Sequence, residues 1–365
     1  MARILDSLPT VYSHFLPDLF SAEQVNETVA TCDDCAMCES PTHGEQEVRR
    51  YSNFPNLFQQ TGKCCTYFPV VPNYLVGGVF SDASPEMAEG QRRMRERILG
   101  RRGATPLVVS GSPSQRLLYM KRDWLVYGDP DAVICPYYAR DTGMCTIWRY
   151  REATCSTYYC KHDEGIDGQK YWKALQEFLD MIEVELAAYA LWKVSPALYR
   201  AQPPRRSVDN VPISATEISG RPMGDDEYGA LWGEWVGREA ELYRACYEAV
   251  RALTPEAFQG VIGSAGQVYT QMISDAYQKV VKPLQLPEVL TFNPGVVAQF
   301  RNGEVVLSGY NLSTAVPMPT KAFWVLRAEL NGLKPLEAVR SRLNEANITD
   351  EMLRTLVRLD VLRPA

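Results

Sequence analysis

Cysteine thiols are the side chains of this sequence best suited to chemistry. Ten occur in 365 residues, and nine of them lie within the first 160. Nine, nine and four residues separate the members of the densest set, which is Cys135, Cys145, Cys155 and Cys160. Thiolates are nucleophiles and soft metal ligands. In a chain of this length the spacing indicates metal ligation, with disulfides or small buried side chains as alternatives.

Five more cysteines precede this set. Cys32, Cys35 and Cys38 form C-x-x-C-x-x-C, which resembles the start of a bacterial ferredoxin ligand set. The fourth position of such a set is Thr42 here, so a site at this place must recruit a cysteine from elsewhere, and a loop of free thiols is the alternative. Cys64 and Cys65 are adjacent, and a disulfide between neighbours is strained. We expect their thiols to point toward one metal or two neighbouring sites.

Zinc and iron-sulfur clusters both accept four thiolates. The Cys135-Pro136 pair, the ferredoxin-like run and the aromatic side chains near Cys145 and Cys160 favour one or two iron-sulfur clusters of the 4Fe-4S type, with zinc as the alternative. His162 could ligate, donate to a cluster sulfur, or be exposed. The predicted metal ligands are Cys32, Cys35, Cys38, Cys64, Cys65, Cys135, Cys145, Cys155 and Cys160.

The composition of the chain limits the classes of partner that we expect. The net charge of -6 and the isoelectric point near 5.4 give no general attraction to nucleic acid or to an anionic membrane. Acids and prolines interrupt the first residues, where a signal peptide needs an apolar core, and no stretch reaches about 18 uncharged apolar residues. We therefore expect a cytoplasmic protein with no membrane association.

The hydrophobic pattern predicts a mainly helical α+β protein. A long helix is expected over 168–194, and two more over 226–253 and 267–281. A helix beginning at Ser84-Pro85-Glu86 is rich in arginines, which either face solvent or hold an anionic partner. Cys246 falls in an apolar stripe and is expected in the core. The predicted domains are a metal-binding domain over 1–195, a helical extension packed on it over 196–282, and a small winged-helix-like domain over 288–365.

The C-terminal region changes character. Apolar runs on both sides of Arg301-Asn302-Gly303 predict a hairpin, and three short helices are expected at about 320–330, at about 335–344 and from Thr349. Residues 288–365 contain nine Lys and Arg and eight Asp and Glu, so no excess of positive charge favours nucleic acid as a partner. A peptide or protein bound along the hairpin edge by strand addition fits this composition better.

Two family resemblances follow from these motifs. Gly62-Lys63-Cys64-Cys65, Cys135-Pro136-Tyr137 and Cys145 through Cys160 resemble the YkgJ-type cysteine-cluster family, described as zinc- or iron-chelating, over residues 60–162. The similarity to flagellin lysine-N-methylases is weaker. The chain departs from the family where it has Gln60 and Thr61 in place of further cysteines, and Glu152 and Ser156 in place of proline and arginine. The resemblance implies metal chelation by these thiols.

Residues 289–363 resemble a PqqD-type peptide-recognition domain, mainly through their leucine spacing. That resemblance implies a bound peptide. Together the two favour a metalloenzyme, or the metal-bearing subunit of one, that modifies a peptide or protein held by residues 288–365. A non-catalytic structural or electron-transfer adaptor is the alternative, and a DNA-binding redox sensor ranks third. No residue is assigned a catalytic role, and whether the chain is an enzyme stays open.

Overall fold

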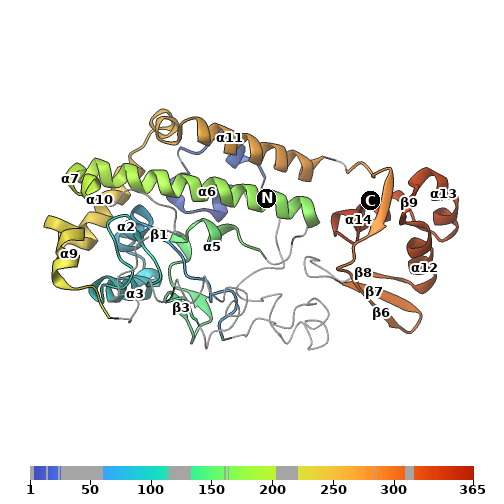
Figure 1. Ribbon diagram of the computed structural model, residues 1–365, viewed down its shortest axis with the longest axis horizontal. Helices are drawn as coiled ribbons and strands as arrows, with labels where there is room; N and C mark the ends of the chain where they lie inside the picture. Colours follow the sequence, from blue (N-terminus) through green and yellow to red (C-terminus); the bar gives the residue numbers. More distant parts are fainter. Residues whose placement is uncertain are drawn as a thin grey trace. The chain divides into compact units, whose positions relative to one another are not determined.

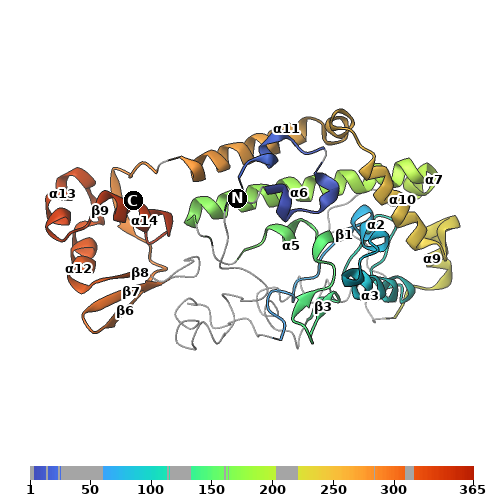
Figure 2. The same cartoon turned by 180° about the vertical axis from the view of Figure 1, so that it is seen from behind.

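The chain is a mainly helical α+β protein with several small antiparallel sheets, as the sequence predicted (Figures 1 and 2). The computed structural model describes residues 4–13, 15–23, 25, 61–112, 115, 133–159, 162, 164–202, 221–282, 284–308 and 316–365. Within these residues no helix has the length and apolar character that crossing a bilayer requires. The chain forms two compact units, and the domain boundaries expected from the sequence stay predictions.

Unit 1 consists of Met1–Gln24, Thr61–Tyr158 and Leu175–Gln271. Its short 3-10 segments are η1 (Ile4–Ser7), η2 (Thr10–Tyr12), η3 (Asp18–Ser21), η4 (Pro85–Met87), η5 (Trp148–Tyr150) and η7 (Gly233–Trp235). Its strands are β1 (Val71–Pro72), β2 (Val108–Val109), β3 (Tyr138–Ala139) and β4 (Met144–Cys145). Helices α2 (Asn73–Ser81), α3 (Ala88–Leu99), α5 (Ala153–Thr157), α7 (Pro196–Ala201), α9 (Asp225–Trp232) and α10 (Glu239–Arg251) lie wholly within it.

Helix α2 is formed by packing and not by propensity. Its sequence N-Y-L-V-G-G-V-F-S is rich in valine and glycine, which are weak helix formers, but eight of its nine residues are buried. A Cβ at Gly77 would lie 1.9 Å from the backbone oxygen of Tyr243 on α10. The two helices therefore touch backbone to backbone, and α2 joins the core that α10 provides.

The predicted helices are largely confirmed. α6 spans Gly165–Val194, and Tyr189 on its apolar side is half-buried. The other large apolar side chains at helical spacing along it are buried, namely Tyr171, Leu175, Phe178, Leu179, Ile182 and Leu186. Cys246 is fully buried among the side chains of α10. The single helix expected over 226–253 is instead α9 and α10, because Gly233 and Gly237 adopt positive φ angles of 53° and 78° between them. α11 (Pro255–Val281) is kinked at Gly263.

Unit 2 consists of Val25–Gln60, Tyr159–Ala174 and Met272–Ala365. Its strands β5 (Val289–Phe292), β6 (Val297–Arg301), β7 (Glu304–Ser308), β8 (Val316–Pro319), β9 (Asn331–Pro335) and β10 (Leu362–Pro364) make two antiparallel sheets, in the orders β10-β5-β9 and β6-β7-β8. Helices α12 (Thr320–Glu329), α13 (Leu336–Glu345) and α14 (Asp350–Arg358) share one hydrophobic core with these strands.

The predicted hairpin and the three short helices of this region are confirmed. Asn302 and Gly303, with φ angles of 42° and 87°, form the two-residue turn between β6 and β7. Such a turn needs positive φ at both positions, which Asn and Gly tolerate best. Thr349 caps α14 by accepting a hydrogen bond from the Met352 N–H. Ile348 and Leu353 are both buried beside this cap.

Candidate metal centre

The adjacent Cys64 and Cys65 lie in a turn that spans 61–66. Lys63 adopts a left-handed conformation with φ 52°, and the Cys65 N–H donates to the Gly62 carbonyl at 2.9 Å. The Cys64 and Cys65 thiols are hydrogen-bonded to each other. The two thiols are therefore close together, and whether they serve one metal or two neighbouring sites stays a prediction.

Cys135 and Cys145 are brought to this turn by backbone contacts. The Cys135 N–H donates to the Cys65 carbonyl at 2.6 Å. Cys145 lies on β4, opposite Tyr138 of β3, in a short hairpin closed by Gly143 at φ 70°. Lys63 Nζ donates to the Gly143 carbonyl at 3.4 Å, so the turn also holds the end of this hairpin.

Cys155 enters from the short helix α5. The Glu152 carboxylate caps this helix, accepting hydrogen bonds from the backbone N–H groups of Thr154 at 2.8 Å and of Cys155 at 2.9 Å. The Cys155 thiol also donates to this carboxylate. Arg151 donates to the Cys155 carbonyl at 2.8 Å, and its guanidinium carbon lies 3.4 Å from the centre of the Trp148 ring. The Glu152 cap and the Arg151 hydrogen bond together fix the position of Cys155.

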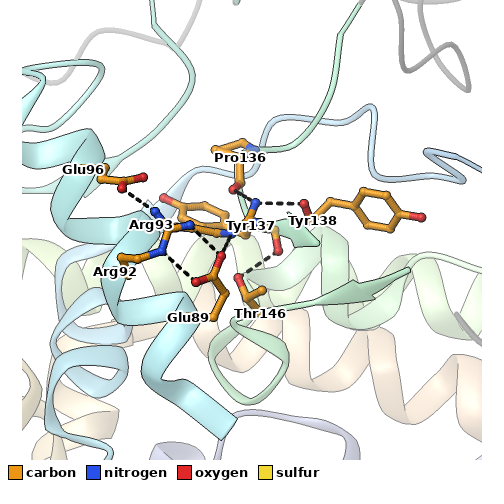
Figure 3. A network of polar contacts seen from close by, with 8 residues as sticks. All are labelled: Glu89, Arg92, Arg93, Glu96, Pro136, Tyr137, Tyr138 and Thr146. Carbon is orange, nitrogen blue, oxygen red and sulfur yellow. Dashed lines mark hydrogen bonds and ion pairs between the residues drawn. The ribbon is translucent and has the colours of Figure 1, made fainter. Parts of the chain in front are cut away.

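Side chains of helix α3 form hydrogen bonds with the loop that follows Cys135 (Figure 3). Arg93 donates to the carbonyl oxygens of Pro136 and Tyr138, both at 2.9 Å, while Glu89 accepts from its Nε at 2.6 Å. A Cβ at Gly90 would lie 2.3 Å from the Thr146 carbonyl, so the helix backbone touches the residue after Cys145. This helix is thus a scaffold for two cysteine segments.

The arginines of α3 have different roles, which the sequence did not separate. Arg92 is exposed and pairs with Glu89 and Glu96. Arg97 is buried and donates to the carbonyls of Arg102 and Ser110. Only part of the arginine-rich face is therefore a solvated surface.

Burial and mutual proximity keep the thiols protonated in the metal-free protein. Burial raises the pKa of Cys135 to about 12, with the neighbouring Cys145 and Cys64 adding to the effect and Arg97 opposing it. The hydrogen bond that the Cys65 thiol donates to Cys64, then burial, raises the pKa of Cys65 far above its usual range. Burial also raises the pKa of Cys145 and Cys155. A bound cation would reverse this preference because it favours thiolates.

The sulfur positions do not match a closed mononuclear site. A tetrahedral zinc ion with bonds of about 2.3 Å holds its sulfurs roughly 3.8 Å apart. In the part of the chain that the structure describes, no three cysteine sulfurs lie within 4.8 Å of one another. Cys65, Cys135, Cys145 and Cys155 are free thiols, so the disulfide alternative is not found for these four. The described cysteines alone therefore do not form a closed mononuclear site, although their thiols are suited to metal ligation.

A group of three acids borders Cys155 and was not predicted. Oxygens of Glu152, Asp180 and Glu183 lie within 4.8 Å of one another. Glu183 accepts hydrogen bonds from the Ala153 N–H and, at 3.4 Å, from the Tyr12 hydroxyl. Burial followed by the nearby Glu152 carboxylate raises the pKa of Glu183, and the pKa of Asp180 rises to about 6 for the same reasons. The signal for Glu183 was present in the sequence as an acid within the apolar stripe of α6.

The remaining predicted residues lie elsewhere. Cys32, Cys35, Cys38 and Cys160 fall outside the described residues, so their part in the centre stays a prediction. His162 belongs to unit 2 and is buried, so the alternative of an exposed histidine is wrong.

Comparison with known proteins adds no further constraint on the family. No family model matches this chain, and neither the curated proteins nor the solved structures contain a significant match to it.

Proposed function

We propose that this chain is a cysteine-ligated metal protein. The observation that supports it best is the gathering of Cys64, Cys65, Cys135, Cys145 and Cys155 from three separate chain segments into one thiol group. Folding brings thiols together at the cost of burying groups that repel one another when ionised. A bound cation would offset this repulsion because it stabilises the thiolate form of its ligands.

An iron-sulfur cluster is our first choice of metal group, with zinc as the alternative. The ferredoxin-like run of Cys32, Cys35 and Cys38 and the Cys135-Pro136 pair support this choice. Such a cluster would supply one-electron chemistry or an open iron for substrate. Cys32, Cys35, Cys38 and Cys160 are the candidates for completing the ligand set or forming a second one.

We further propose that the protein acts in the modification of a peptide held by its C-terminal elements. The small helices and the hairpin of 288–365 suit a winged-helix-like peptide-recognition domain of the PqqD type. Within the described residues no strand pairs with the outer side of β6 in the three-stranded sheet β6-β7-β8, and open sheet edges bind extended peptides by strand addition.

One preparation tests the metal proposal. We expect protein purified without oxygen to contain iron and sulfide and to absorb visible light. A colourless protein with stoichiometric zinc would replace the cluster with zinc, and a protein that binds neither metal would overturn the proposal. If every metal proves to have four protein ligands, the non-catalytic adaptor becomes the better interpretation.

A further inference from the structure

The hairpin of unit 2 carries an aromatic surface that its core leaves uncovered. Phe300 of β6 and Trp324 of α12 are 53% and 57% exposed, although their rings stack with centroids 5.6 Å apart. Phe323 lies against both rings, at 5.5 Å from Phe300 and 5.1 Å from Trp324. Two large rings fixed at the surface offer a rigid apolar contact, a common feature of binding sites.

This aromatic surface is flanked by cations. Lys321 and Arg327 stand three residues before and after Trp324 on α12, and both are exposed. Neither makes an ion pair with any residue that the structure describes, although the Arg327 guanidinium carbon lies 5.0 Å from the centre of the Phe292 ring. Most other described cations of residues 288–365 are paired with acids, namely Lys334, Arg340, Arg342, Arg358 and Arg363. The positive charge beside Trp324 is therefore available to an anionic partner.

The same surface borders an open strand edge. Arg301 and Glu304 flank the two-residue turn of the hairpin, so they exchange both backbone hydrogen bonds, and bonded pairs then alternate along the strands. By this alternation the backbone groups of Ala298 and Phe300 point away from β7. β6 is an edge strand, and no described strand pairs with its outer side. An added strand would find donors and acceptors there.

The opposite edge of the sheet is blocked. The alternation that starts at the turn directs Val305 and Leu307 of β7 toward their partners Met318 and Val316 on β8. The outward positions of β8 are then Pro317 and Pro319, which have no N–H to donate. Proline at an edge is a recognised obstacle to strand addition. A peptide that adds to this sheet therefore has only the β6 side open to it.

We propose that the edge of β6, together with Phe300, Lys321, Trp324 and Arg327, binds an extended acidic peptide. The peptide backbone pairs with Ala298 and Phe300. One apolar or aromatic side chain lies beside Phe300 and Trp324, since directly opposed residues of neighbouring strands share a face. Carboxylates of the peptide, two residues before and after this side chain on the same face, pair with Lys321 and Arg327. This inference rests on the peptide-binding part of the proposed function and not on its metal centre.

The test uses the full-length protein and a fluorescein-labelled peptide with the core Glu-Thr-Phe-Thr-Glu, whose acids and phenylalanine share one face of a strand. Fluorescence anisotropy should show saturable binding. Trp324→Ala and the double variant Lys321→Glu/Arg327→Glu should each weaken it about tenfold or more. The control Lys279→Glu/Lys282→Glu, in the last turn of α11 and just after it, makes the same change in net charge and should bind as the wild type does. So should Leu333→Ser, which alters an exposed apolar residue of β9.

Changes in the peptide test its chemistry. Replacing both glutamates by lysine, or methylating backbone nitrogens that pair with β6, should abolish binding. Absence of binding to the acidic peptide, or equal binding by the surface variants and the wild type, would overturn the inference. It would also fall if Trp324→Ala instead abolished self-association of the protein, or binding of labelled oligothymidine. Metal content is measured on the same samples. If the protein contains no metal but binds the peptide, only the metal proposal is refuted. If the protein contains metal but does not bind the peptide, only this inference is refuted.

Discussion

At the scale of single residues, the cysteines divide into two classes by their surroundings. Cys135 and Cys246 are both buried, but Cys135 has other thiols as neighbours, whereas burial alone raises the pKa of Cys246. Burial therefore does not separate a ligand from a core residue. Neighbouring thiols are the feature that makes Cys135 a candidate ligand and Cys246 a core residue.

A pair of matched substitutions tests this division. Cys135→Ser removes a candidate ligand and should lower the metal content of the purified protein by a large fraction. Cys246→Ser leaves a hydroxyl in an apolar core, which should cost about 1–3 kcal/mol of stability but leave the metal content unchanged. Metal analysis and urea unfolding of both variants measure the two effects. Equal metal loss in both variants would mean that unfolding, and not ligand removal, is responsible.

The acidic group next to Cys155 should make the stability of the protein depend on pH. The pKa of Asp180 is raised from 3.8 to about 6, first by burial and then by Glu152 and Glu177. The folded state therefore binds more protons than the unfolded state between these values, so this contribution to stability is complete below about pH 4 and is lost as the pH rises through about 6. The full shift corresponds to about 3 kcal/mol, which solvent screening at this exposed residue reduces to about 1 kcal/mol.

Asp180→Asn removes that titration. Relative to the wild type, the variant should gain stability as the pH rises from about 4 to about 7. Urea unfolding of both proteins across this range measures the difference. A difference in stability that stays constant with pH would contradict the assignment.

At the scale of elements, periodicity predicted what a single chain segment determines by itself. α6, the β6–β7 hairpin and the three C-terminal helices follow from apolar spacing and turn residues. α2 did not, because its valines and glycines disfavour a helix until α10 packs against it. Strands β5, β9 and β10 were also missed, since each is short and its partners are distant in the sequence. The thiol group was predicted from residue type, but the scaffold of α3 depends on contacts that no local pattern encodes.

Gly90 is where this scaffold is most sensitive. Alanine is a better helix former than glycine, so Gly260→Ala, at a position in α11 with open space around it, should stabilise the protein by about 0.5–1 kcal/mol. Gly90→Ala should do the opposite and cost about 1–3 kcal/mol, because its Cβ would push against the Thr146 carbonyl. Metal affinity should fall as well, since Thr146 follows Cys145. Thermal unfolding and metal titration distinguish the two variants. If Gly90→Ala stabilises the protein as Gly260→Ala does, α3 does not position the β3–β4 hairpin.

At the scale of the whole molecule, the proposed metal centre and the proposed peptide-binding surface belong to different units. The described cysteines of the candidate centre lie in unit 1, and the aromatic surface of Phe300 and Trp324 lies in unit 2. Unit 2 has its own core, formed by leucines of α12, α13 and α14 with side chains from β5, β7 and β8. A ligand that binds only the folded form of one unit stabilises that unit first.

Removing the metal should therefore loosen one unit selectively. We expect a chelator to speed amide hydrogen exchange at 62–66 and 135–147, where the turn and the hairpin carry the thiols, because the protonated thiols no longer bind a common cation. Exchange at 336–362, within the core of unit 2, should change little. Hydrogen-exchange mass spectrometry before and after chelation measures both regions. Uniform acceleration across the chain would show that the metal stabilises both units together, and unchanged exchange at 62–66 would place the metal away from Cys64 and Cys65.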